Sequence, residues 1–134
     1  MFNFAGKRPN NIGVSEGKLA ACPNSPNCVS SQSPSQDEQH YIEPFPYTSN
    51  STQEAIAQLK TVIEGLERTT IITEQGNYLY AEFKSKLMGY VDDVEFYVDE
   101  GQKVIHVRSA SRLGKSDLGV NRKRVETIRG LMKG

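Results

Sequence analysis

Apolar and polar side chains alternate between residues 69 and 112, and this pattern predicts four β-strands, at 69–74, 78–87, 91–98 and 103–112. Gly76-Asn77 between the first two is typical of a two-residue hairpin turn. Because successive side chains of a strand point to opposite faces, the pattern also predicts one apolar and one polar face. The apolar face collects Leu79, Ala81, Phe83, Ser85, Leu87, Val94, Phe96, Val98, Ile105 and Val107.

Charges on the polar face predict the register of this meander. A four-residue loop at 88–91 sets Phe83 opposite Phe96 and Ala81 opposite Val98. With a second loop at 99–102, opposite charges meet as Lys86 with Asp93, Lys84 with Glu95, Asp93 with Arg108 and Glu95 with His106. A slip of one residue would exchange the two faces, so the pattern favours this alignment.

Two helices are predicted, one before the meander and one after it in the sequence. Ser51 is the expected N-cap of a helix over about 52–66, in a capping box with Glu54. After Gly114 a second helix is expected, capped by Ser116 or Asp117. Its inward side chains would be Leu118, Val125, Ile128, Leu131 and Met132. The order helix, four-stranded antiparallel meander, helix predicts an α+β fold with both helices on one face of the sheet.

All six prolines lie in the first 50 residues, which are therefore expected to be irregular. We expect a flexible segment over 1–18 and a single domain over 19–134. Within that domain, 19–50 would be a strap packed on the α-β4-α unit at 51–134. The packing would use Leu19, Val29, Tyr41, Ile42, Phe45 and Tyr47.

The 16 basic and 16 acidic side chains cancel, but they are unevenly placed. Residues 37–106 hold 13 acids and 5 bases, and residues 107–134 hold 8 bases and 2 acids. The absence of an overall basic excess argues against nucleic acid as a partner. The chain shows neither an apolar run long enough to span a bilayer nor a secretory signal, so the expectation is a cytoplasmic protein without an integral membrane segment. The sequence predicts no cofactor and says nothing of the oligomeric state.

Polar side chains crowd the junction between the last strand and the last helix. We expect a ligand site there for a small anionic or amphipathic molecule, formed by Asp92, Arg108, Ser109, Ser111, Arg112, Ser116, Asp117, Asn121 and Arg122. A purely structural interpretation is equally physical. In it Arg108 pairs with Asp93, Arg112 caps carbonyls or meets Asp92, and Asn121 ties the junction to the strap. R-L-G-K-S is not a phosphate-binding P-loop, since Ser109 stands where that motif needs glycine.

Two enzymatic alternatives remain open. His106 beside Glu95 has the form of a general base oriented by a carboxylate. Asp92 with Arg112 is the other candidate pair. The predicted register places no Ser or Thr nucleophile directly opposite His106, and the reaction of either candidate stays unspecified.

Cys22 and Cys28 are the only cysteines. In an oxidising compartment they could close a short disulfide loop, and in a reducing cytosol two free thiols are the default. A third functional hypothesis is therefore a redox-responsive module. A zinc site would need both cysteines and both histidines, His40 and His106, so no metal site is predicted.

Three segments resemble the DUF1499 family of small bacterial and plant-plastid proteins: C-P-N-S-P-N-C-V-S-S, A-E-F-K-S-K-L-M-G-Y-V-D-D-V-E-F and H-V-R-S-A-S-R-L-G-K-S-D-L-G-V-N-R-K-R-V-E. The resemblance covers about 19–132, and the opening M-F-N-F-A-G-K-R-P is similar to cyanobacterial members. It implies no activity. Family members often carry an N-terminal membrane segment or lipoprotein signal, so envelope or thylakoid association is implied by the resemblance alone. The first hypothesis is a non-enzymatic domain that binds a ligand or a partner protein.

Overall fold

The computed structural model describes residues 6–86, 89–113 and 118–133. Its helices and strands are β1 (Cys28–Ser30), β2 (Phe45–Pro46), α1 (Thr52–Glu64), β3 (Thr69–Gln75), β4 (Tyr78–Lys84), β5 (Val91–Asp99), β6 (Val104–Ser111) and α2 (Val120–Lys133). The sheet order is β1-β6-β5-β4-β3, with β2 beside β1 on the same edge of β6, and all pairs are antiparallel. The α+β class is confirmed, but the sheet has six strands rather than four.

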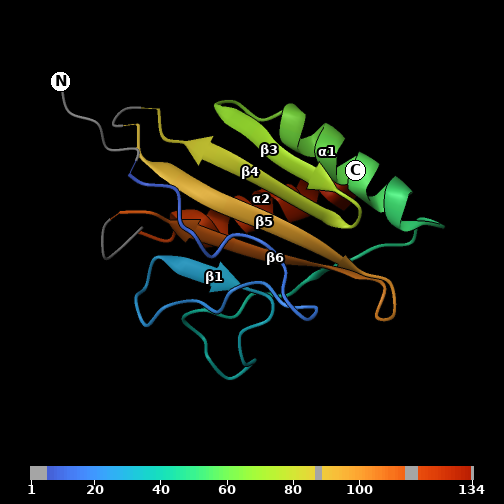
Figure 1. Ribbon diagram of the computed structural model, residues 1–134, viewed down its shortest axis with the longest axis horizontal. Coiled ribbons are helices and arrows are strands. Elements are labelled where there is room, and N and C mark those ends of the chain that lie inside the picture. The colour runs from blue at the N-terminus through green and yellow to red at the C-terminus, as the bar shows by residue number, and fades with distance from the viewer. Residues whose placement is uncertain (1–5, 87–88, 114–117, 134) are drawn as a thin grey trace.

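Both helices pack on one face of the sheet, and the N-terminal segment crosses the other (Figure 1). Between helices and sheet lies the core, where alternate side chains of β4, β5 and β6 meet α1 and α2. The buried side chains there include Leu79, Ala81, Phe83, Val94, Phe96, Val98, Ile105, Val107, Ile56, Leu59, Ile63, Val125 and Ile128. The predicted apolar face of the meander is therefore confirmed.

The predicted register is wrong, although the faces are right. Ala81 lies opposite Val94 rather than Val98, and Phe83 lies opposite Asp92 rather than Phe96. The pairing is displaced by four residues, an even number, so no side chain changes face. The cause is the connection: β4 ends at Lys84, and a bond from Ser85 N to Tyr90 O closes a turn earlier than expected.

The second predicted pairing is displaced by two residues. Glu95 lies opposite Arg108, and His106 lies opposite Tyr97 instead of Glu95. Asp93 lies opposite Ala110 instead of Arg108. Lys84 lies opposite Val91, so the predicted Lys84–Glu95 and Lys86–Asp93 pairs do not form. Opposite charges were a poor guide because the same face holds many carboxylates that several cations could meet.

Helix α1 begins as predicted, with the Ser51 hydroxyl accepting from Glu54 N at 3.1 Å. Helix α2 buries Val125 and Ile128, but Leu118 is 92% exposed and Leu131 47% exposed, so their inward prediction is wrong. The predicted caps Ser116 and Asp117 lie outside the described residues.

The N-terminal strap packs on the domain as expected. Leu19, Val29, Ile42, Phe45 and Tyr47 are buried, and Tyr41 is half-buried. Two pieces of the strap, β1 and β2, join the sheet by pairing with β6. Residues 6–18 continue the strap across the polar face, where Gly13 N donates to Glu95 Oε1 at 2.8 Å.

Candidate functional site

A buried hydrogen-bond network joins β6, α2 and the strap, and Asn121 is its centre. Asn121 Oδ1 accepts from Ser109 Oγ at 2.6 Å and from Arg124 Nη1 at 2.8 Å. Its Nδ2 donates to Ser111 Oγ at 2.9 Å and to the Asn27 carbonyl at 3.2 Å. Asn121 and Ser109 are fully buried. The interpretation that Asn121 ties the junction to the strap agrees with this geometry.

Arg124 extends the network toward solvent. Its Nη2 lies 2.7 Å from Asp92 Oδ2, and its guanidinium lies 5.0 Å from the centre of the Phe83 ring. The side chain of Arg124 is 15% exposed and that of Asp92 is 10% exposed, so the ion pair is shielded from water on most sides. Asp92 was expected to meet Arg112, and that expectation is wrong. The acid points to the core face, where α2 supplies its cation.

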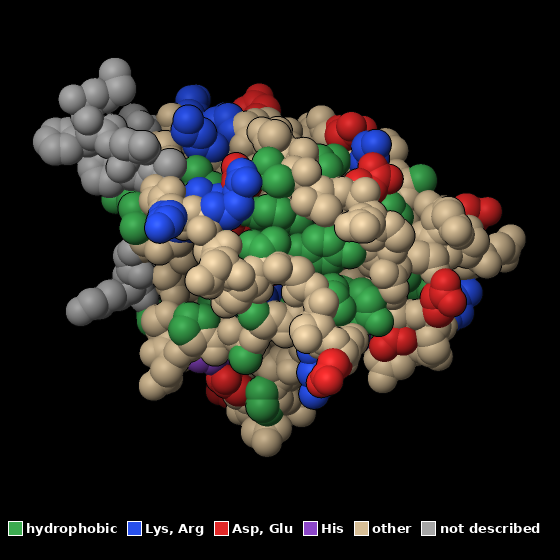
Figure 2. Space-filling view, in the orientation of Figure 1, with side chains coloured by type: hydrophobic (Ala, Val, Ile, Leu, Met, Phe, Trp, Pro, Cys, Tyr) green, Lys and Arg blue, Asp and Glu red, His purple; other side chains and the backbone are tan. Residues whose placement is uncertain are grey.

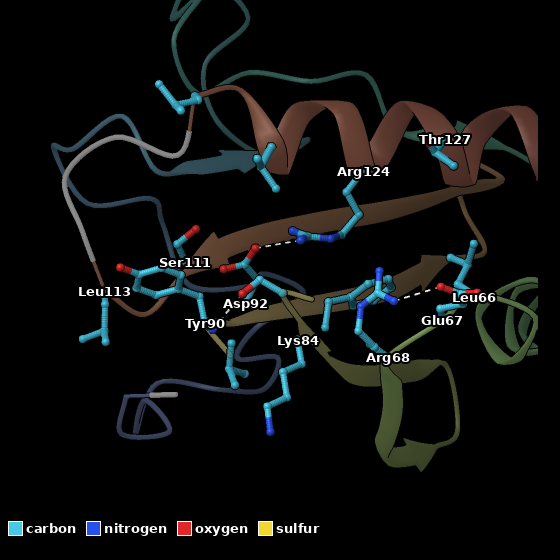
Figure 3. Close-up of a pocket in the computed structure, with 15 residues that line it drawn as sticks. Leu66, Glu67, Arg68, Lys84, Tyr90, Asp92, Ser111, Leu113, Arg124 and Thr127 are labelled. Atoms are coloured by element: carbon cyan, nitrogen blue, oxygen red, sulfur yellow. Dashed lines mark hydrogen bonds and ion pairs between the residues drawn. The ribbon is translucent and has the colours of Figure 1, made fainter. Parts of the chain in front are cut away.

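The Arg124–Asp92 pair forms part of the wall of a pocket of about 850 Å³ (Figure 3). The pocket lies between the start of α2, the ends of β4 and β6, the start of β5 and the turn after α1. Its lining is mainly apolar: Leu66, Phe83, Tyr90, Val91, Leu113, Leu118 and Val120, with Ser85, Ser111 and Thr127 adding hydroxyls. A concave, largely apolar site with a few polar groups is the usual form of a small-molecule site.

Two further cations line this pocket, Arg68 and Lys84. Their backbones are adjacent, because Lys84 N donates to the Arg68 carbonyl at 2.9 Å. Arg68 also pairs with the exposed Glu67 at 2.8 Å. Among the described residues no hydrogen bond or ion pair engages the Lys84 ammonium. The Arg68 and Lys84 side chains extend in different directions from this edge of the pocket (Figure 3), so each offers its positive charge separately.

The two arginines that the sequence placed in one site with Asn121 lie on the opposite face, beneath the strap. Arg112 binds both oxygens of Asp93 at 2.8 and 2.9 Å and Glu82 Oε2 at 2.6 Å. The Asp93 carboxylate, followed by Glu82, raises the pKa of the guanidinium. An Asp92–Arg112 pair is therefore absent, because neighbouring residues of β5 face opposite sides of the sheet.

Arg108 lies beside the fully buried Glu95, with Arg108 Nη1 3.8 Å from Glu95 Oε2. It does not pair with Asp93, which is taken by Arg112. Burial raises the pKa of the Glu95 carboxyl, while bonds from the Tyr78 hydroxyl and Gly13 N oppose the rise. These groups are covered by the strap, and they hold it to the sheet.

His106 contacts Ser31 rather than Glu95. Its Nδ1 lies 3.0 Å from Ser31 Oγ, and its Nε2 lies 3.9 Å from Asp99 Oδ2. Although the residue types are those of a catalytic triad, Ser31 Oγ also accepts from Val107 N at 2.9 Å and is buried. Burial lowers the pKa of the imidazole. The Ser31 hydroxyl accepts the hydrogen bond from β6 that the carbonyl of a neighbouring strand would otherwise accept. Because its oxygen is buried and engaged in this way, Ser31 is a poor nucleophile.

The remaining predicted residues play separate parts. Arg122 donates to the carbonyls of Glu38 and Gln39, at 3.2 and 3.3 Å, so it fastens α2 to the strap. Ser116 and Asp117 are outside the described residues. Of the predicted residues that the structure describes, only Asp92 and Ser111 line the pocket.

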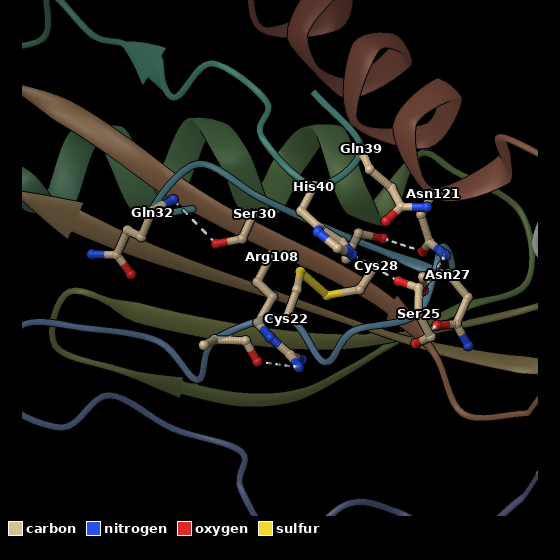
Figure 4. Close-up of a disulfide and its surroundings, with 12 residues drawn as sticks. Cys22, Ser25, Asn27, Cys28, Ser30, Gln32, Gln39, His40, Arg108 and Asn121 are labelled. Carbon is tan, nitrogen blue, oxygen red and sulfur yellow. Dashed lines mark hydrogen bonds between the residues drawn. A yellow bond between two sulfur atoms is a disulfide. The ribbon is translucent and has the colours of Figure 1, made fainter. Parts of the chain in front are cut away.

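Cys22 and Cys28 are joined by a disulfide (Figure 4). The loop that it closes carries Asn27, whose carbonyl accepts from Asn121. Nearby, His40 Nδ1 lies 2.8 Å from Asp37 Oδ2, and its Nε2 lies 2.8 Å from the Ser25 carbonyl. The Asp37 carboxylate raises the pKa of His40. Within the described ranges no group of three or more His, Cys, Asp or Glu side chains could hold a metal ion.

Sequence reasoning missed the main pocket residues, Arg124, Lys84, Tyr90 and Leu113. One signal was present: Val120, Arg124 and Thr127 recur at helical spacing and form the face of α2 that lines the pocket. That spacing could have set Arg124 on a different face of the helix from the exposed Lys123. Nothing in the pattern indicated that β4 and the turn after α1 would face it.

Fold and site together define a small α+β domain with a polar, buried helix–sheet junction that opens into a partly apolar pocket. The chain belongs to the family described as "Protein of unknown function (DUF1499)", whose model matches residues 18–132. The resemblance seen in the sequence is thereby confirmed. Among curated proteins, a sequence search finds no match. Within the part of the chain that the structure describes, no helix has the length and apolar character needed to cross a membrane.

Proposed function

We propose that this domain binds a small amphipathic molecule with an anionic headgroup, without catalysis, in the pocket between α2 and the sheet. The pocket itself is the observation that carries the proposal, since its volume of about 850 Å³ lies within the range of sites for drug-sized ligands. We therefore place the ligand site in this pocket instead of at the predicted cluster around Arg108 and Arg112, because both guanidinium groups are engaged by carboxylates beneath the strap.

The pocket lining has an apolar part and a cationic part, and each matches one part of the proposed ligand. Leu66, Phe83, Val91 and Leu113 offer a surface for an apolar chain. Lys84 and Arg68 both line the pocket and offer positive charge at the edge of that surface. Arg124 is already neutralised by Asp92, so the headgroup belongs at Lys84. An acyl chain ending in a carboxylate or phosphate has this chemistry.

The first experiment is a titration with cis-parinaric acid, a fluorescent fatty acid, followed by its emission. Thr127→Trp places a bulky ring on the exposed pocket wall of α2, and we expect it to weaken binding at least about tenfold. Glu126→Trp is the matched control, because its neighbouring position is exposed but does not line the pocket. Equal binding by wild type and Thr127→Trp would refute the assignment of the pocket.

The headgroup is tested with a second pair of variants. Lys84→Ala removes the cation at the pocket, and Lys133→Ala removes one at the far end of α2. We expect only Lys84→Ala to weaken binding of the fatty acid, and neither to change binding of the uncharged alcohol of the same chain length. If both variants bind the fatty acid as wild type does, the ligand is not recognised through its charge.

The disulfide bears on where the protein would act. Cysteine pairs persist in oxidising compartments and are reduced in most cytosols. We propose such an oxidising compartment in place of the cytoplasmic location expected from the sequence. Alkylation of the freshly extracted protein under denaturing conditions tests this: the native protein should incorporate no label until it is reduced. Labelling of both cysteines before reduction would favour the cytoplasm.

A further inference from the structure

Large apolar side chains are exposed around the mouth of the pocket. The described residues include five such exposed side chains, and four of them line this pocket: Tyr90, Leu113, Leu118 and Val120. Leu118 is 92% exposed and has φ of 54°, a backbone conformation that leucine rarely adopts. Clustered apolar exposure of this kind marks interaction surfaces, whereas single exposed leucines are common.

Two basic residues, Lys86 and Lys7, neighbour residues that line the same mouth. Lys86 lies in the turn that carries Tyr90, closed by Ser85 N to Tyr90 O. Lys7 follows Gly6, which packs so closely on Leu113 that an added Cβ would lie 3.1 Å from Leu113 Cγ. No hydrogen bond or ion pair within the described ranges engages the ammonium of Lys7 or Lys86. Both are therefore available to an anionic partner.

The acids at this end of the molecule are already neutralised by arginines. Glu82 and Asp93 bind Arg112, Glu82 also binds Arg8, and Asp92 binds Arg124. Figure 2 shows Lys and Arg side chains gathered at the left end of the molecule, where β4 ends and β5 begins in Figure 1. Although the chain has no net charge, this end is positive.

We propose that this end docks on an anionic lipid bilayer, so that the pocket opens onto the membrane surface. Leu118, Leu113 and Tyr90 enter the interface, and Lys7, Lys84 and Lys86 contact lipid phosphates. A second copy of the chain fits less well, because two such ends would bring six lysines together. The docking itself is independent of the pocket, whereas the passage of a ligand from bilayer to pocket rests on the proposed function.

Flotation with vesicles tests the docking. The chain is mixed with vesicles of phosphatidylcholine alone, or of phosphatidylcholine with phosphatidylglycerol. We expect it to float with the anionic vesicles only, and less so at high salt because surface charges are screened. Leu118→Asp should weaken the partition at least about tenfold. The double variant Lys7→Ala/Lys86→Ala should weaken it about 25-fold, at roughly fivefold per charge near the surface.

Matched controls lie at the other end of α2. Leu131→Asp makes the same change at an exposed leucine outside the pocket, and Lys133→Ala removes a charge there. Both should float as wild type does. Equal loss in Leu131→Asp and Leu118→Asp would overturn the proposal. Flotation with both vesicle types alike would overturn it too, as would a dimer in light scattering that Leu118→Asp dissociates.

The two proposals fail separately. If wild type binds cis-parinaric acid in solution but floats with neither vesicle, the docking is wrong and the ligand site stands. If it floats with anionic vesicles through Leu118 but does not bind the fatty acid, the docking is supported and the ligand proposal fails.

Discussion

Replacing Asn121 with alanine should destabilise the domain more than any surface change, because three separate parts of the chain meet at this side chain. It accepts from Ser109 on β6 and from Arg124 on α2, and it donates to Ser111 and to the Asn27 carbonyl in the disulfide loop. The Asn121 side chain is fully buried, so water cannot readily replace the lost amide.

The size of the effect follows from the contacts. Three neutral hydrogen bonds contribute about 1 kcal/mol each, and the bond from the charged guanidinium contributes about 1.5–3 kcal/mol. Because these values are not additive in a shared network, we expect Asn121→Ala to lower the free energy of unfolding by about 3–5 kcal/mol. With a urea slope of about 1–3 kcal/mol/M, the unfolding midpoint should fall by about 2 M.

The assay is urea unfolding followed by circular dichroism. Asn50→Ala, at an exposed asparagine, is the control and should stay within about 0.5 kcal/mol of wild type. Ser109→Ala should lose about 1 kcal/mol, and the double variant Asn121→Ala/Ser109→Ala should lose less than the sum of the two. A loss below about 1 kcal/mol for Asn121→Ala would refute this account of the junction, and strict additivity would refute the coupling.

Three further predictions concern the strap. Arg112→Met should lower the free energy of unfolding by about 3–5 kcal/mol, since it leaves the buried Asp93 carboxylate without its cation and Glu82 with Arg8 alone; an unchanged urea midpoint would contradict this. Cys22→Ala/Cys28→Ala should lower it by about 2–3 kcal/mol, and reduction of wild type should match, as thermal melts with and without reductant can check. Asp37 raises the pKa of His40 above 6.5, so the stability that His40 adds is fully present below pH 6.5 and is lost as pH rises through the folded pKa. The difference in unfolding free energy between wild type and His40→Gln should therefore shrink from pH 6 to pH 8.5, and a difference that grows would reverse the assigned sign.

The division of the candidate site shows how far residue patterns reach. Arg108, Arg112 and Asn121 are close along the chain, and the sequence placed them in one site. In the structure the two arginines lie beneath the strap, while Asn121 lies on the helix side of the sheet. The alternation of β6 had already put Arg108 and Arg112 on the polar face. The apolar face, in turn, is the one that needs a helix to cover it, and this indicates the side of the sheet on which α2 and Asn121 lie. Combining these two observations would have separated the groups.

The sequence by itself determined the α+β order, the apolar face of the meander, the Ser51 cap of α1 and the family. These depend on local periodicity and capping, which neighbouring residues encode. Only the tertiary structure decided the strand register, the two extra strands of the strap and the partner of Asp92. Each depends on where distant segments pack: an even register shift keeps every side chain on its face, and several cations could satisfy one acid. The pocket is of the same kind, because its lining comes from segments that meet only when α2 closes over the sheet.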